Sequence, residues 1–275
     1  MGPGFKSRRA RHISLFRMLW SNMFFEIVKD VYVVKGFPAL YLSQYDALII
    51  ADMHLGFEES MAIKGTYVPQ IQLKEIIEKI DSMISIAKPS WIIINGDVKH
   101  EFTKLLRQER NEILALISFL RNKDISHITI IRGNHDTFIS PLLYRLGVGF
   151  VDTLTLDNIV ITHGHVDINP GILGGKLIII GHEHPAVVLR DELNIAHKFP
   201  CTVVGKLKTG QNIIIIPSLS IYASGNVLTL DKESYLSPII RKYCLIEELT
   251  PYIIDEYLGV LELPNLRTLA SMGYF

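Results

Sequence analysis

Short apolar runs that end at a turn or a polar residue recur along the chain, and each predicts a buried strand. The clearest is residues 91–94, which Asn95, Gly96 and Asp97 follow at once. Five more runs have this form, at residues 47–51, 128–131, 159–161, 177–180 and 213–216. Because open α/β sheets bind ligands beyond the carboxyl ends of their strands, the residues after these runs are the first candidates for chemistry.

Two longer segments carry apolar residues at helical spacing. The first helix is predicted to begin at Pro69 and to end near Ala87, where Lys88 and Pro89 stop it. Its expected inward residues are Ile71, Ile76, Ile77, Ile80 and Ile84. The second helix is predicted over about residues 104–123, with Leu105, Ile113, Leu116, Ile117 and Leu120 inward. Residues 55–68 are predicted to form a polar loop.

The pattern changes at Phe150, after which strands dominate. Before that point, residues 31–34 and 39–42 are predicted to form a hairpin, and residues 141–146 a short helix. After it, residues 202–208 are expected to pair with residues 211–216 across Thr209 and Gly210. The first half therefore has the order βαβαβ and the second half is mostly β, which indicates an α/β protein.

Composition excludes several classes of protein. Hydrophobic residues make up 48% and charged residues 20% of the 275 residues, which is typical of a globular chain. Lys plus Arg equals Asp plus Glu at 28 each, which argues against binding of nucleic acid by bulk charge but leaves a local basic patch open. No run approaches the roughly 18 apolar residues of a membrane helix. Two cysteines outside any CxxC pattern, Cys201 and Cys244, favour the cytoplasm.

The ends of the chain differ from its body. Residues 1–22 hold five basic residues and no acid, which predicts a disordered basic arm or an extension read from an early start codon, with Met23 as the true start. Contact of this arm with nucleic acid is the alternative. The main domain is expected over residues 23–243. Residues 244–275 are expected to be a tail that adds a strand or a helix over that domain.

Nitrogen and oxygen donors follow the predicted strands. In an extended segment, the spacing of Asp52 and His54 puts both side chains on one face, and His182 and His184 have the same spacing. With Asp97, Asn134 and His163 they make seven candidate metal ligands, none of them sulfur. Seven are too many for one tetrahedral zinc ion, so they suit two metal ions that share a carboxylate. These donors favour Mn, Fe, Ni, Co or Zn over Ca or Mg.

The order of these residues along the chain resembles the motif order of the calcineurin-like metallophosphoesterase superfamily. That family's blocks D-x-H, G-D, G-N-H-[DE], H and G-H-x-H occur here without a departure, ending in Gly181-His182-Glu183-His184. The resemblance covers roughly residues 30–230, and residues 96–101 and 182–185 resemble the archaeal phosphoesterases related to the nuclease subunit of the double-strand-break repair complex. It implies two packed mixed β-sheets flanked by helices.

The resemblance also implies a role for each residue. The first of two divalent metal ions, with Mn as the first choice, would be held by Asp52, His54, Asp97 and His184. The second would be held by Asp97, Asn134, His163 and His182, so that Asp97 bridges them. His135 would protonate the leaving oxygen of a phosphate ester, and Asp136 would orient His135.

Several residues keep two interpretations. Lys99, His100 and His165 lie beside the ligand blocks and are either substrate-binding residues or ordinary loop residues. His12, His127 and His197 are expected to be hydrogen-bonded core residues, and Cys201 a small buried residue.

The predicted function is hydrolysis of phosphodiester or phosphomonoester bonds by a metal-activated water. The alternatives are a repair-type nuclease acting on DNA and a catalytically silent, metal-stabilised partner subunit. The presence of His135 favours an enzyme, because a silent subunit would often lose this acid while it keeps the ligands.

Overall fold

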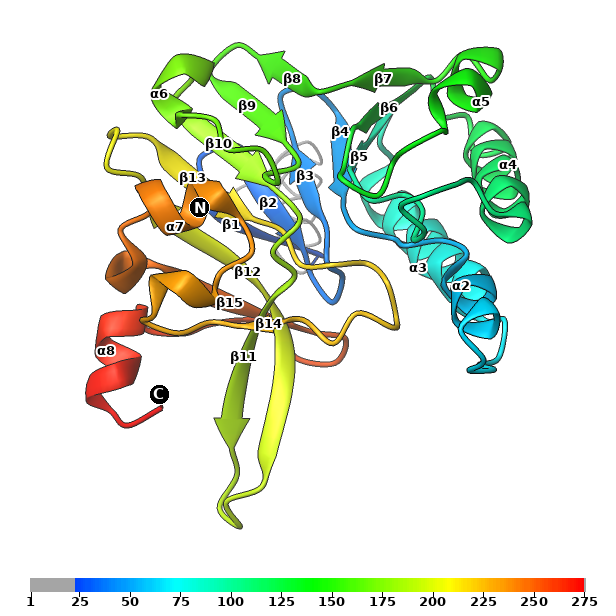
Figure 1. Cartoon of the computed structure of the whole chain (residues 1–275). Helices are drawn as coiled ribbons and strands as arrows, with labels where there is room; N and C mark the ends of the chain where they lie inside the picture. The colour runs from blue at the N-terminus through cyan, green and yellow to red at the C-terminus, as the bar shows by residue number, and fades with distance from the viewer. Residues whose placement is uncertain (1–22, 275) are drawn as a thin grey trace, which may run out of the picture.

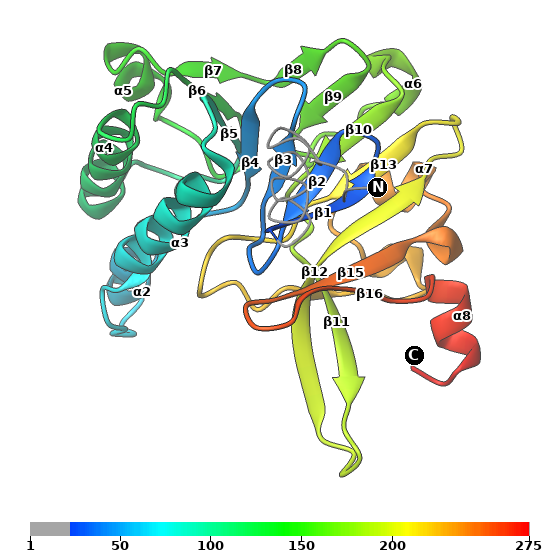
Figure 2. The same cartoon turned by 180° about the vertical axis from the view of Figure 1, so that it is seen from behind.

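Two β-sheets lie face to face and helices cover their outer sides in the computed structural model, which describes residues 23–274 (Figure 1). The helices of the first half cover one sheet, and short helices of the second half cover the other (Figures 1 and 2). The prediction of two packed mixed sheets flanked by helices is confirmed. The predicted arm, residues 1–22, lies outside the described residues.

The first sheet has its seven strands in chain order. They are β1 (Phe24–Val28), β2 (Val31–Val34), β3 (Leu40–Leu42), β4 (Ala47–Ile50), β5 (Trp91–Asn95), β6 (His127–Ile131) and β7 (Gly149–Val151). β1 to β4 are antiparallel to one another, which confirms the first predicted hairpin. β4 to β7 are parallel, so the loops that follow β4, β5 and β6 leave the same edge of the sheet.

The second sheet has nine strands. They are β8 (Thr153–Leu156), β9 (Ile159–Thr162), β10 (Leu177–Ile180), β11 (Pro185–Arg190), β12 (Ala196–Lys206), β13 (Asn212–Ile215), β14 (Asn226–Val227), β15 (Thr250–Asp255) and β16 (Gly259–Glu262). β9, β10 and β13 are parallel, while β12 and β13 form the second predicted hairpin. β11 and the start of β12 extend from the body as a two-stranded arm (Figure 2).

Helices fill the outer layers. Beside the first sheet are α2 (Phe57–Ile63), α3 (Gln72–Ala87), α4 (Arg107–Arg121) and α5 (Ser140–Arg145). Beside the second sheet are α6 (Pro170–Leu173), α7 (Pro238–Tyr243) and α8 (Leu266–Ser271), with 3₁₀ turns at Lys232–Ser234 and Ile246–Glu248. Residues 244–274 thus contribute both a helix and strands, since β15 pairs with β12. No helix within residues 23–274 is long and apolar enough to cross a membrane.

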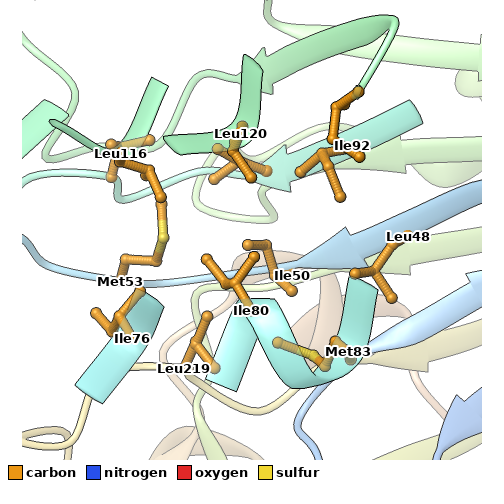
Figure 3. Close-up of a cluster of buried hydrophobic side chains, with 14 of the residues drawn as sticks. Leu48, Ile50, Met53, Ile76, Ile80, Met83, Ile92, Leu116, Leu120 and Leu219 are labelled. Atoms are coloured by element: carbon orange, nitrogen blue, oxygen red, sulfur yellow. The ribbon is translucent and has the colours of Figure 1, made fainter. Parts of the chain in front are cut away.

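The period of two along each strand separates the layers of the core. Leu48 and Ile50 of β4 point toward Ile80 and the other apolar side chains of α3 and α4 (Figure 3). Ala47 and Ile49, which alternate with them along the strand, face the second sheet instead. A fully buried Ile or Leu side chain stabilises a fold by about 1.5–3 kcal/mol. The two sheets are therefore held rigidly against each other below their loop edges.

Some sequence predictions fail in detail. Residues 57–63 form a helix and not part of a polar loop. The prediction missed this helix because its buried side chains are polar and show no apolar period. Glu58 and Ser60 are buried there, and Glu58 Oε1 accepts hydrogen bonds from the amides of Ile71 and Gln72. Since α3 begins only at Gln72, Ile71 precedes the helix and is 42% exposed instead of inward.

The prediction that two further histidines are core residues is also wrong. His127 and His197 are exposed, and His197 pairs with Asp191 on the two-stranded arm. The burial of an isolated histidine cannot be predicted from the periodicity of the sequence. His12 lies outside the described residues, whereas Cys201 is fully buried as expected.

Candidate metal centre

The loops after β4, β5, β9 and β10 meet at one edge of the two packed sheets. The amide of Asp52 donates to the carbonyl of Gly96, and the amide of His54 donates to that of Asp97. In the second sheet, the amide of Gly181 donates to the carbonyl of His163. Main-chain hydrogen bonds therefore fix the loops to one another before any side chain is considered.

A first group of donors comprises Asp52, His54 and His184, whose ligand atoms all lie within 4.8 Å of one another. The Nε2 atom of His184 is 3.3 Å from Oδ1 of Asp52 and 3.4 Å from Nε2 of His54. Asp52 is fully buried, and its carboxylate also accepts the main-chain amide of His182 at 3.1 Å. Residues of both sheets thus contribute to this group.

A second group comprises Asp97, His163 and His182, again within 4.8 Å of one another. The Nε2 atom of His163 is 3.3 Å from Oδ2 of Asp97 and 3.2 Å from Oδ1 of Asn134. The same Oδ2 of Asp97 is 4.0 Å from Nε2 of His54 in the first group. The carboxylate of Asp97 therefore lies between the two groups.

The backbone at these residues is not extended, which corrects the reasoning from the spacing of two. Asp52, His54, Asp97, His182 and His184 all have φ between 48° and 64°, in the left-handed region. His184 lies in the first group and His182 in the second, as the family resemblance implies, whereas Asp52 and His54 share one group. Such conformations cost about 1–3 kcal/mol each and cluster at functional sites. The packed core beneath these loops can offset that cost.

Two glycines allow the close approach of the loops. A Cβ atom at Gly133 would lie 2.1 Å from Oδ1 of Asp97 and 2.3 Å from its main-chain nitrogen. At Gly96, where φ is +81°, a Cβ atom would lie 2.2 Å from Nδ1 of His163. No other residue fits at either position without displacement of Asp97 or His163.

Electrostatic interactions set the charge of the donors. Burial raises the pKa of Asp97, but the neighbouring His163, His135 and His54 rings hold it well below its usual range. Burial lowers the pKa of His163, but the carboxylates of Asp97 and Asp52 raise it to about 9. Burial dominates at His54 and lowers its pKa to about 3. A metal ion would replace the positive charge that His163 now supplies to these carboxylates.

His135 lies beside the two groups, with Nε2 at 3.8 Å from Oδ2 of Asp97. Its Nδ1 atom is hydrogen-bonded to the main-chain carbonyl of His100, so the Nε2 atom is the one that faces the donors. The ring of Phe102 covers it, with ring centroids 3.6 Å apart. Burial lowers the pKa of His135, although the charge of Asp97 opposes this.

Asp136 does not orient His135, contrary to expectation. Its Oδ1 atom accepts the amide of Val98 at 2.8 Å and its Oδ2 atom accepts the amide of Gly133 at 2.9 Å. Asp136 is 3% exposed, and burial raises its pKa to about 7. It joins the loop after β5 to the loop after β6, while the carbonyl of His100 orients His135.

The three residues that kept two interpretations, Lys99, His100 and His165, differ in burial and in contacts. Lys99 is fully buried and its Nζ atom donates to the carbonyls of Glu101 and Lys104, so its ammonium group is a structural one. His100 is half-buried, and its ring centroid lies 5.5 Å from that of His54. His165 is half-buried, with its ring centroid 5.3 Å from that of His163.

Sequence reasoning missed two supporting residues. Glu109 is fully buried and accepts the amides of His100, Glu101 and Leu106. Its position three residues after the N-cap of α4 is the signal that could have identified it. Gln72 is fully buried and donates to the carbonyls of Met53 and His54. No sequence pattern marks Gln72.

The chain is similar to one described family and to several solved structures. Residues 46–178 match the family model described as Calcineurin-like phosphoesterase, a stretch that ends before His182 and His184. The structure of Pseudomonas putida nuclease MPE has 18% sequence identity and a TM-score of 0.62, and the match covers 87% of this chain and 98% of that one. A phosphoesterase from E. coli matches with 16% identity and a TM-score of 0.34, over 64% of this chain and 80% of that one. No curated protein matches the chain.

Proposed function

We propose that the chain is a calcineurin-like phosphoesterase, since residues 46–178 match that family model, and that it hydrolyses phosphate esters with two divalent metal ions. The observation that carries the proposal is the position of Asp97. Its Oδ2 atom lies 3.3 Å from Nε2 of His163 and 4.0 Å from Nε2 of His54, between the two donor groups. A single carboxylate in that position can serve both ions.

The donors fit two metal ions. Asp52, His54, Asp97 and His184 would hold one, and Asp97, Asn134, His163 and His182 would hold the other. The fit is supported by the second nitrogen of His163, which is 2.9 Å from the carbonyl of Asn95 and so leaves Nε2 for a metal, an arrangement typical of metal-binding histidines. With nitrogen and oxygen donors only, Mn is our first choice, before Fe, Ni, Co or Zn.

When bound, two such ions supply an activated water and neutralise charge on a phosphoryl group. The chain itself then has to place the ester and provide a proton for the leaving oxygen. We assign the proton to Nε2 of His135, because the carbonyl of His100 occupies Nδ1. An anionic phosphate next to the ring would favour its charged form and so oppose the effect of burial.

The substrate is proposed to be a phosphodiester or a phosphomonoester. The shared fold of a nuclease, Pseudomonas putida MPE, makes phosphodiesters of nucleic acid one candidate, as does the finer resemblance to archaeal repair-type phosphoesterases. A catalytically silent partner subunit is the competing proposal. The hydrogen-bonded setting of His135 favours an enzyme, because a silent subunit has no need of an oriented acid.

A substrate screen tests the proposal. Purified full-length protein loaded with Mn is assayed on bis-p-nitrophenyl phosphate, p-nitrophenyl phosphate, cyclic nucleotides, and single- and double-stranded DNA. We expect hydrolysis of at least one phosphate ester that stops when the metal is chelated and returns when Mn is added. Metal-loaded, folded protein that cleaves none of them would favour the silent subunit.

A further inference from the structure

A pocket of 370 Å³ opens beside the first donor group. His54 and His184 form part of its wall, together with His100, so a group bound there would adjoin the proposed phosphate position. Phe57, Tyr222, Glu183, Asn226 and Leu236 also line it. This volume lies within the range of about 300–1,000 Å³ that small-molecule sites have.

One wall of the pocket is aromatic. The rings of Phe57 and Tyr222 are stacked, with centroids 4.6 Å apart and an interplanar angle of 19°. His100 meets Phe57 edge-on, with centroids 4.9 Å apart. Half-buried rings that line an open pocket leave part of their surface to a ligand. The wall therefore offers flat aromatic surface next to His100, whose ring centroid lies 5.5 Å from that of the donor His54.

This wall is held in place before any ligand binds. The hydroxyl of Tyr222 donates to the carbonyl of Pro69 at 2.7 Å, and its amide donates to Oγ of Ser220 at 3.3 Å. Phe57 opens α2, which Glu58 ties to the start of α3. Binding to a pre-ordered surface loses little conformational entropy, so stacking energy is available for affinity.

The other groups in the pocket select against a second phosphate. None of the described residues that line it is Lys or Arg. The carboxylate of Glu183 accepts hydrogen bonds from the amides of Leu236 and Ser237 and from the side-chain amide of Asn226, so its acceptor oxygens are already occupied. Leu236 adds apolar surface, 50% exposed. The pocket thus suits a flat neutral group with a polar edge.

We propose that this pocket binds the nucleobase of a nucleoside phosphodiester whose phosphate lies at the metal centre, an inference that rests on the proposed phosphoesterase function. A nucleobase has two aromatic faces, a polar edge and no charge. Its sugar links it to the phosphate over the short distance that the shared wall requires. Base stacking on aromatic side chains typically contributes about 5- to 150-fold in affinity.

Two esters with the same leaving group test this assignment. Thymidine 5′-(p-nitrophenyl phosphate) and methyl p-nitrophenyl phosphate differ only in the group that does not leave. For the full-length Mn-loaded protein we expect kcat/KM to be about 5- to 150-fold higher for the thymidine ester. Tyr222→Ala and Phe57→Leu should reduce that preference, mainly through KM of the thymidine ester, whereas Tyr222→Phe should retain it. Tyr144→Ala, which removes an 86% exposed ring outside the pocket, is the matched control and should leave kcat/KM unchanged for both esters.

A binding measurement separates this inference from the proposed function. Equilibrium dialysis should show thymidine 5′-phosphate bound more tightly than methyl phosphate by the wild type, and equally weakly by Tyr222→Ala. Hydrolysis of both esters without preference, or a preference that survives both Tyr222→Ala and Phe57→Leu, would overturn the nucleobase site. Hydrolysis of neither ester, with the dialysis result intact, would overturn the proposed function and leave the site. Parallel assays with a dinucleotide and a single-stranded oligonucleotide distinguish free nucleotide esters from nucleic acid.

Discussion

The Nδ1 atom of His135 is hydrogen-bonded to the main-chain carbonyl of His100, which turns its Nε2 atom toward the donor groups. His100 belongs to the loop after β5, whereas His135 follows β6. The acid that we assign to the reaction is therefore oriented by the backbone of a neighbouring loop. The same loop carries Phe102, whose ring covers His135.

Removal of the His135 imidazole should separate catalysis from metal binding. His135→Ala should keep both metal ions and the fold, since the seven proposed ligands remain, and should lose about 100- to 10,000-fold in kcat on esters with poor leaving groups. The loss should be smaller with p-nitrophenyl esters, whose leaving group departs without a proton. Metal analysis and rates on both ester types check this, with Asp97→Ala as the contrast that loses metal and all activity. Equal losses on good and poor leaving groups would refute the role of His135.

Glu109 should act on His135 through the loop. Its carboxylate accepts the amides of His100 and Glu101 at 3.1 and 2.6 Å, and so fixes the carbonyl that orients His135. Glu109→Gln places amide hydrogens against at least one of the three main-chain donors, those of His100, Glu101 and Leu106, and should lower kcat by about 10- to 100-fold. The loss should again be larger on poor leaving groups, with both metals retained. Glu78→Gln, at an exposed position on α3, is the control; a uniform loss on all esters would mean that Glu109 supports only the fold.

Metal binding should release protons. The carboxylates of Asp97 and Asp52 outweigh burial and raise the pKa of His163 to about 9, so this ring holds a proton near neutral pH in the metal-free protein. A metal ion needs the neutral ring, and its affinity should therefore rise with pH up to about 9. Calorimetric titration with Mn in two buffers of different ionisation enthalpy should give different apparent enthalpies. Identical enthalpies would show that no proton is released.

A methyl group at Gly133 should disturb the bridging carboxylate. The added Cβ atom would lie 2.1 Å from Oδ1 of Asp97, so Gly133→Ala should lose metal affinity and about 1–3 kcal/mol in the free energy of unfolding. Gly171→Ala is the matched control, because the atom nearest to its Cβ is 3.3 Å away. Denaturant unfolding and metal analysis of the two variants check this. Full metal binding by Gly133→Ala would mean that the loops are not as tightly apposed as described.

Much of the fold could be predicted because each buried strand is a continuous apolar run with a polar stop. Residues 91–94 gave β5, and the helical spacing of Ile76, Ile80 and Ile84 gave α3. α2 could not be predicted in this way, since Glu58 and Ser60 are its buried residues and no apolar period marks it. Its helical form depends on contacts with α3 and α4 that lie outside the segment.

The candidate site was predictable in composition but not in geometry. The donors could be identified because each follows an apolar run, as Asp97 follows β5. The family resemblance assigned His184 and His182 to different ions, and the two donor groups have this division. The left-handed backbone at both residues is a feature that their spacing does not reveal. The partner of His135 is a main-chain carbonyl, and side-chain patterns carry no information about such a contact.

The carboxylate of Asp97 is proposed to bridge two metal ions. Crystals soaked with Mn and measured at wavelengths on both sides of the Mn absorption edge test it directly, because anomalous peaks locate each ion independently of activity. We expect two peaks about 3.5–4 Å apart, one beside Asp52, His54 and His184 and the other beside Asn134, His163 and His182, with Asp97 between them. One peak, no peak, or two peaks that do not share Asp97 would contradict it.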